Sequence, residues 1–152
     1  MLNERGPQMS HIIMTNKLMV TLFAAGLLAS GCATVQKSDS NVLQGTWKGY
    51  EVGRATDGTC RLVISGNTLD YRGASANDWC KGTFTLREDT TPKQLVGVMS
   101  ECDDPQYVGK TVHAIYRIDA DTLTLAGSEP GSAEVPAGFD ASGCRKLVLK
   151  KQ

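Results

Sequence analysis

The chain has 152 residues, of which 16 are basic and 16 are acidic, so its formal net charge at pH 7 is zero. This balance excludes the strongly basic surface of a typical nucleic-acid-binding protein, and we expect no nucleic-acid partner. After residue 31, helical periodicity is nearly absent. Short segments of alternating polarity recur instead between Gly, Asn, Asp and Pro residues, which predicts an all-β domain.

An apolar run of 12 residues, Leu18–Ala29, lies near the N-terminus. Its length is typical of the hydrophobic region of a signal peptide and is too short for a transmembrane helix, which takes about 20 residues. Lys17 supplies the preceding positive charge if translation starts at Met14, so we interpret residues 1–13 as an upstream extension. We therefore place residues 1–31, the extension and the signal peptide, outside the folded domain.

The apolar run ends in Leu28-Ala29-Ser30-Gly31-Cys32, which resembles the lipobox of bacterial lipoproteins. In that family the cysteine sulfur receives a diacylglycerol, the chain is cut before the cysteine, and the new amino group is acylated. The resemblance implies lipid attachment at Cys32, a membrane as partner and a place in the bacterial cell envelope. Ala33, where Asp would retain such a protein at the inner membrane, favours the outer membrane with the protein facing the periplasm. An ordinary signal peptide with an incidental cysteine is the alternative.

The rest of the chain divides into a tether and one domain. We expect the lipidated cysteine and a polar tether over residues 32–41, and a single folded domain over residues 42–152. A domain of about 110 residues is large enough to bury one hydrophobic core.

The folded part contains eight segments with strand-like alternation, separated mostly by short turn sequences such as Gly66-Asn67. Successive hairpins predict an up-and-down antiparallel order, and eight such strands avoid exposed edges best by closing into a barrel. A two-sheet β-sandwich is the alternative. The expected strands cover residues 45–52, 60–65, 68–72, 80–86, 94–102, 111–118, 122–126 and 144–150.

Four cysteines follow Cys32, and an even number in an oxidising compartment indicates two disulfides. No C-x-x-C pair is present, which disfavours a structural metal site. A hairpin turning at residues 90–93 places Cys80 opposite Cys102, close enough for a cross-strand disulfide. Cys60 and Cys144 then remain for each other. The same register makes Phe84 face Val98 and Leu86 face Val96.

No catalytic motif emerges from the sequence: it has no nucleophile elbow, phosphate-binding loop, dinucleotide loop or H-E-x-x-H. His113 is out of phase with the apolar residues beside it, so we expect it to face outward. Glu101, Asp103 and Asp104 flank Cys102 and could hold a hard cation, but the last two are also common turn residues. We therefore predict neither an enzyme nor a bound metal or cofactor.

The inward-facing set predicted from the alternation is apolar, and two functions fit it. The barrel could hold a small apolar ligand, or it could be filled by side chains and dock a protein partner through the long loop at residues 128–143. For the first function we expect the cavity that holds the ligand to be lined by Trp47, Tyr71, Phe84, Tyr116 and Phe139. The remaining inward positions are Leu62, Ile64, Leu69, Leu86, Val96, Val98, Val112, Ala114, Ile118, Leu123, Leu125, Leu147 and Leu149.

Gly45-Thr46-Trp47 resembles the G-x-W signature of lipocalins. In that fold the tryptophan closes one end of the barrel, and a basic residue of the last strand packs across it. Lys150 is the best positional match for that residue, with Lys151 close by.

The chain resembles more closely a family of lipocalin-like domains first recognised in planctomycetes. The shared motifs are LQGTW at residues 43–47, T-x-P-K at residues 90–93, GKTVHAIYRIDADTL at residues 109–123, and a proline followed by a phenylalanine, here Pro136 and Phe139. The four cysteines depart from the family pattern. The resemblance implies a lipocalin-like barrel and no particular activity.

Overall fold

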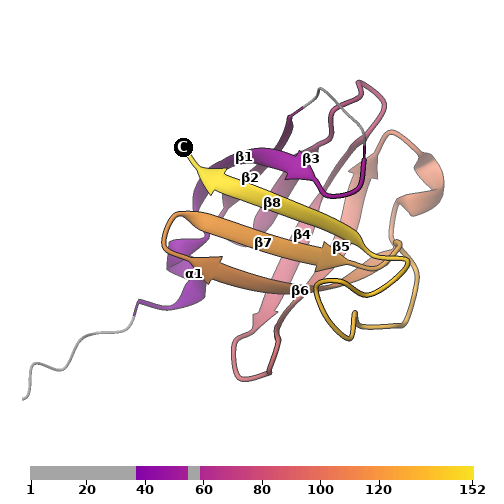
Figure 1. Ribbon diagram of the computed structural model, residues 1–152. Coiled ribbons are helices and arrows are strands. Elements are labelled where there is room, and N and C mark those ends of the chain that lie inside the picture. Colours follow the sequence, from indigo (N-terminus) through magenta and orange to yellow (C-terminus); the bar gives the residue numbers. More distant parts are fainter. Residues whose placement is uncertain (1–36, 55–58) are drawn as a thin grey trace, which may run out of the picture. The chain divides into compact units, whose positions relative to one another are not determined.

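The computed structural model describes residues 37–54 and 59–152, which form a closed eight-stranded antiparallel barrel (Figure 1). Each strand pairs with the next along the chain, and β8 pairs with β1, so the order is up-and-down. The predicted barrel is confirmed and the sandwich alternative is wrong. The strands are β1 (Gly45–Glu51), β2 (Cys60–Ser65), β3 (Thr68–Arg72), β4 (Trp79–Arg87), β5 (Lys93–Cys102), β6 (Thr111–Asp119), β7 (Thr122–Gly127) and β8 (Arg145–Lys151).

Two short helices accompany the barrel. Helix α1 (Asp39–Val42) precedes β1, and the 3-10 helix η1 (Pro105–Tyr107) lies between β5 and β6. Helix α1 therefore begins at Asp39, inside the segment 32–41 that we predicted to be a polar tether. No helix within residues 37–54 and 59–152 is long and apolar enough to cross a membrane.

Strand alternation places large apolar side chains inside the barrel. Trp47, Leu123 and Leu149 have no exposed surface, and their sequence neighbours Lys48 and Lys150 are exposed. The strand segments are thus amphipathic with a period of two, which is the pattern that a half-buried strand requires. The other buried members of the core are Leu43, Cys60, Leu62, Ile64, Phe84, Leu95, Ala114, Tyr116 and Leu125.

The hairpin of β4 and β5 contains a bulge that corrects part of the predicted register. Cys80 faces Cys102 as expected, but the register shifts between Lys81 and Gly82, so that Phe84 faces Gly97. One extra residue in a strand moves every later side chain to the opposite face. The predicted inward positions Val96 and Val98 are therefore wrong. Their neighbours Leu95 and Met99 are the buried residues, and Val98 is 45% exposed.

The expected disulfide between Cys80 and Cys102 is present, with the two Cα atoms 4.1 Å apart. The second expected disulfide is not formed, and Cys60 and Cys144 are both free thiols. Strand β1 separates them: Cys60 pairs with Gly49, and Gly49 pairs on its other side with Leu149. Cys144 lies five residues before Leu149, so it is displaced along the barrel as well as across it.

One end of the barrel is closed by Trp47. Its indole Nε1 donates a hydrogen bond to the backbone oxygen of Leu43 at 2.8 Å. Lys151 Nζ lies 5.2 Å from the ring centroid and donates to the backbone oxygen of Val42 at 2.6 Å. The basic residue that packs across the tryptophan is therefore Lys151, and not Lys150.

Helix α1 is fixed over this closed end by a polar contact. Asp39 Oδ2 accepts hydrogen bonds from Lys93 Nζ at 2.7 Å and from the Tyr116 hydroxyl at 2.8 Å. Tyr116 is 2% exposed, so its hydroxyl needs such a partner. The described N-terminal segment therefore joins the barrel at its closed end.

The long loop between β7 and β8 lies against the outside of the barrel, beside β6 (Figure 1). Phe139 packs on Arg117 of β6, 5.2 Å from ring centroid to guanidinium carbon, and Asp140 accepts from Lys146 Nζ at 2.7 Å. Ile115 and Ala126 point outward by their strand alternation, yet they have no exposed surface. Phe139 is thus a residue of the outer wall and not of the barrel interior.

Two inward-facing glycines provide a test of this packing. A Cβ at Gly49 would overlap the Val148 carbonyl oxygen, whereas a Cβ at Gly127 would lie 3.7 Å from its nearest neighbours. We predict that Gly49→Ala lowers the free energy of unfolding by about 2 kcal/mol, because a backbone atom must move. Gly127→Ala should change it by less than about 0.5 kcal/mol. Urea denaturation of both variants checks this, and equal losses would contradict the described approach of β1 and β8.

Candidate functional site

The half of the barrel away from Trp47 contains a cavity of about 180 Å³. Its wall is almost entirely apolar. The cavity exists because small residues occupy three inward positions, Gly97, Ala114 and Gly127. The other lining residues are Leu62, Ile64, Leu69, Tyr71, Cys80, Leu95, Met99, Val112, Leu125, Ser128, Pro130, Arg145 and Leu147.

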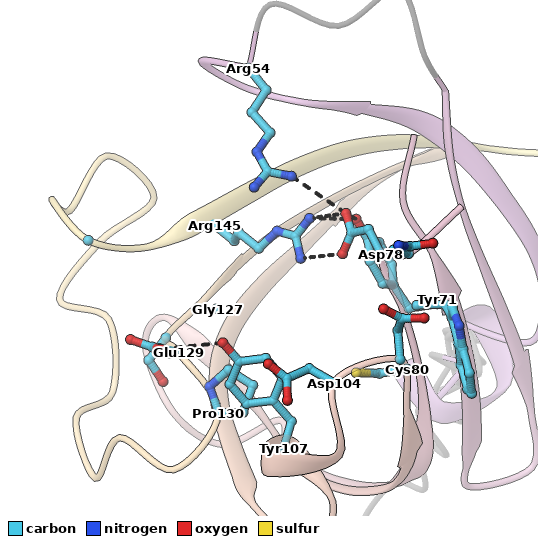
Figure 2. A pocket seen from close by; sticks show the side chains of 15 residues that line it. Arg54, Tyr71, Asp78, Cys80, Asp104, Tyr107, Gly127, Glu129, Pro130 and Arg145 are labelled. Carbon is cyan, nitrogen blue, oxygen red and sulfur yellow. Dashed lines mark hydrogen bonds and ion pairs between the residues drawn. The ribbon is translucent and has the colours of Figure 1, made fainter. Parts of the chain in front are cut away.

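A second, polar cavity of about 310 Å³ lies at the mouth of the barrel, and we call it the vestibule (Figure 2). Its walls come from the β3–β4 connection, the β5–β6 connection with η1, and the two ends of the β7–β8 loop. The vestibule and the apolar cavity share six lining residues, so the two spaces adjoin. The shared residues are Tyr71, Cys80, Gly127, Ser128, Pro130 and Arg145.

Arg145 lies at the boundary between the two spaces. It opens β8 and has the same inward phase as Leu147 and Leu149. Its Nη1 and Nη2 donate to the two carboxylate oxygens of Asp78, at 2.9 and 2.5 Å. Its Nε and Nη2 donate to Glu51 Oε2 at 3.1 and 2.8 Å. The guanidinium is therefore held by two carboxylates, a geometry that gives strong, directional pairing.

Tyr71 completes this cluster. Its hydroxyl accepts from Arg145 Nη2 at 3.1 Å and donates to Asp78 Oδ2 at 3.4 Å, and the guanidinium lies 5.2 Å from its ring centroid. Burial raises the pKa of the Tyr71 hydroxyl far above its ordinary value, although the positive charge of Arg145 opposes this. Tyr71 therefore stays protonated and remains a donor to Asp78.

The pKa of Asp78 is set by two opposed effects. Burial of the carboxyl raises it, but the hydrogen bonds and the charge of Arg145 lower it more, so the pKa lies below its ordinary value. Asp78 is consequently ionised at neutral pH. Burial also raises the pKa of the Cys60 thiol, which keeps that interior cysteine protonated and unreactive.

Only Tyr71 among the five predicted ligand-lining residues lines the cavity. Trp47 and Tyr116 belong to the closed end, Phe84 lies in the core, and Phe139 lies outside the barrel. Arg145 and Asp78 were missed. The available signal for Arg145 was its phase, since it precedes Leu147 and Leu149 by even steps along the last strand. Cys32, the predicted lipid-attachment residue, lies outside the described residues.

The acidic residues near Cys102 do not assemble a metal site. Glu101 pairs with Lys81 at 2.9 Å, and Asp104 accepts from the backbone nitrogen of Gln106 at 3.0 Å and so caps η1. No group of three or more potential metal-ligating side chains occurs in the part of the chain that the structure describes. His113 lies between Val112 and Ala114, which both line the cavity, so it has the outward phase that we expected.

Comparison of the chain with protein-family models gives no match, and comparisons with curated proteins and with solved structures give none either.

The opposed effects on Asp78 give a testable result. We predict that Arg145→Gln raises the pKa of Asp78, because burial of the carboxyl is then opposed only by the charge of Arg54 and the hydrogen bond from Tyr71. In the native protein the depressed pKa adds stability above the ordinary pKa of Asp, and this is lost as pH falls through the folded-state value. Carboxyl-carbon NMR titration of both proteins measures the shift. An Asp78 pKa that is the same in both would contradict the described pairing, and Lys150→Gln serves as a distant control.

Proposed function

We propose that this domain binds a small apolar ligand inside the barrel and that it does so as a lipid-anchored protein of the bacterial envelope. The observation that carries the proposal is the apolar cavity of about 180 Å³ that adjoins the vestibule. An aliphatic cavity of about 150 Å³ in another protein stays dry and accepts benzene. The cavity thus suits a ring-sized group or a short alkyl chain, with any polar end in the vestibule.

Binding without catalysis agrees with the chemistry of the cavity wall. The two nucleophilic residue types in the lining are already engaged, because Cys80 is in a disulfide and the Ser128 hydroxyl donates to the backbone oxygen of His113 at 3.0 Å. The Tyr71 hydroxyl is held by Arg145 and Asp78. No group in the lining of this cavity forms a nucleophile–base pair.

The lipid anchor is supported by the sequence of the leader and by the entry point of the chain. Cys32 precedes Asp39 by seven residues, which span at most about 25 Å. Asp39 is fixed over the closed end by Lys93 and Tyr116. A lipid on Cys32 would hold the closed end toward the membrane and leave the mouth open to the periplasm. The barrel agrees with the lipocalin-like resemblance, whose tryptophan and basic residue are here Trp47 and Lys151.

Filling the cavity tests the ligand proposal. We expect octan-1-ol to shift the amide NMR signals of Gly97 and Gly127 in a saturable manner. Ala114→Leu should weaken this binding about tenfold, because the added carbons displace roughly two ligand methylenes, each contributing about 0.8 kcal/mol. Val98→Leu, on the outer face of β5, is the matched control and should bind as the native domain does. Absence of saturable shifts in the native domain would favour the alternative, a filled barrel that acts through its surface.

Substitution of the predicted anchor tests the localisation. We predict that Cys32→Ser abolishes labelling of the protein by radioactive palmitate and releases it from the membrane fraction into the periplasmic extract. Without the Cys32 thiol no diacylglycerol can be attached, so no lipid-mediated membrane association should remain. A Cys32→Ser protein that still fractionates with membranes would show that another feature holds it there.

A further inference from the structure

The two arginines that line the vestibule, Arg54 and Arg145, are already paired with carboxylates. Arg145 is held by Glu51 and Asp78, and Arg54 lies 3.6 Å from an oxygen of each of these same carboxylates. Two guanidinium groups thus face two carboxylates. An anionic ligand head would have to displace Asp78 or Glu51 from Arg145, and the released carboxylate would then lack its partner.

Further carboxylates line the vestibule without a basic partner. Asp103, Asp104 and Glu129 are exposed, and none forms an ion pair with a Lys or Arg within residues 37–54 and 59–152. Among the described residues, the Glu129 carboxylate accepts a hydrogen bond only from the Tyr107 hydroxyl, at 3.5 Å, and Asp104 accepts from Gln106. Figure 2 shows Asp104, Tyr107 and Glu129 together, across the vestibule from Arg145 and Asp78. The vestibule lining therefore carries an excess of negative charge.

The position of this charge matters because an apolar cavity lies directly beneath it. A ligand whose alkyl part occupies the cavity must leave its polar end in the vestibule, since the cavity wall offers almost no polar partner. There a cationic head meets carboxylates and the ring of Tyr107, which is also favourable for a cation. A carboxylate head is repelled by the carboxylates of the rim, and Arg145 is already paired with Asp78 and Glu51.

We propose that the mouth of this barrel selects apolar ligands with a cationic head, such as alkylammonium compounds, over neutral ones and most strongly over carboxylates of the same chain length. This inference rests on the proposed ligand-binding function and specifies its ligand class.

Three eight-carbon probes with different heads test the selectivity at pH 7 and low ionic strength: octylammonium, octan-1-ol and octanoate. Binding is measured by the NMR titration of Gly97 and Gly127. We expect octylammonium to bind about three to ten times more tightly than octan-1-ol, and octanoate to bind more weakly than either. The preference should shrink as salt is raised, because the rim carboxylates are exposed to solvent.

The variant Asp103→Asn/Glu129→Gln assigns the effect to the rim. It should bring the affinities for octylammonium and octan-1-ol close together, because the charge is removed while the apolar cavity that holds both alkyl chains is untouched. The matched control is Asp89→Asn/Asp121→Asn, which removes two exposed carboxylates in the β4–β5 and β6–β7 turns at the opposite end and should keep the preference.

The outcomes separate the two proposals. Saturable binding of octan-1-ol with equal or weaker binding of octylammonium would overturn the selectivity and leave the ligand-binding function standing. The same holds if the rim variant and the control variant lose the preference equally. Failure of all three probes to bind would overturn the ligand-binding function itself.

Discussion

The pairing of Arg145 with Asp78 and Glu51 is the interaction on which the open end of this barrel depends. A guanidinium beside an apolar cavity is costly unless its donors are satisfied, and here two carboxylates and the Tyr71 hydroxyl satisfy them. The partners come from β1, β3 and the β3–β4 connection, so the contact ties β8 to the opposite side of the mouth (Figure 2). The charge of the Arg145 guanidinium is held in the polar vestibule by these partners, and the space beneath it is apolar.

The two ends of the barrel differ because residues of different size occupy equivalent inward positions. Trp47, Phe84 and Tyr116 fill the closed end, where Lys151 and α1 complete the seal. Gly97, Ala114 and Gly127 leave space at the other end. The cavity thus results from specific small side chains inside an otherwise regular barrel. The first described residues, at α1, lie over the sealed end and leave the mouth unobstructed.

The strands and the Cys80–Cys102 disulfide could be predicted from the sequence because period-two alternation and hairpin register are local properties. The bulge at Lys81/Gly82 could not, since a single extra residue leaves the apolar pattern of β5 compatible with either face. On one face of β5 lie Val96 and Val98, and on the other lie Leu95 and Met99. Either pair could form part of the core. Arg145 was missed because a charged residue in inward phase is recognised only when Asp78 and Glu51 are known to lie nearby. The outer position of Phe139 depends on the path of the β7–β8 loop, which strand pattern does not determine.

Xenon binding tests whether one end of the barrel is hollow and apolar. Apolar cavities of this size take up xenon, and methyl NMR spectra recorded under xenon pressure report where it binds. We predict saturable shifts concentrated at Leu62, Ile64, Ala114 and Leu125, which line the cavity, and none at Leu123 or Leu149 in the packed core. Spectra without shifts at the cavity residues would show instead that the barrel is filled by its own side chains.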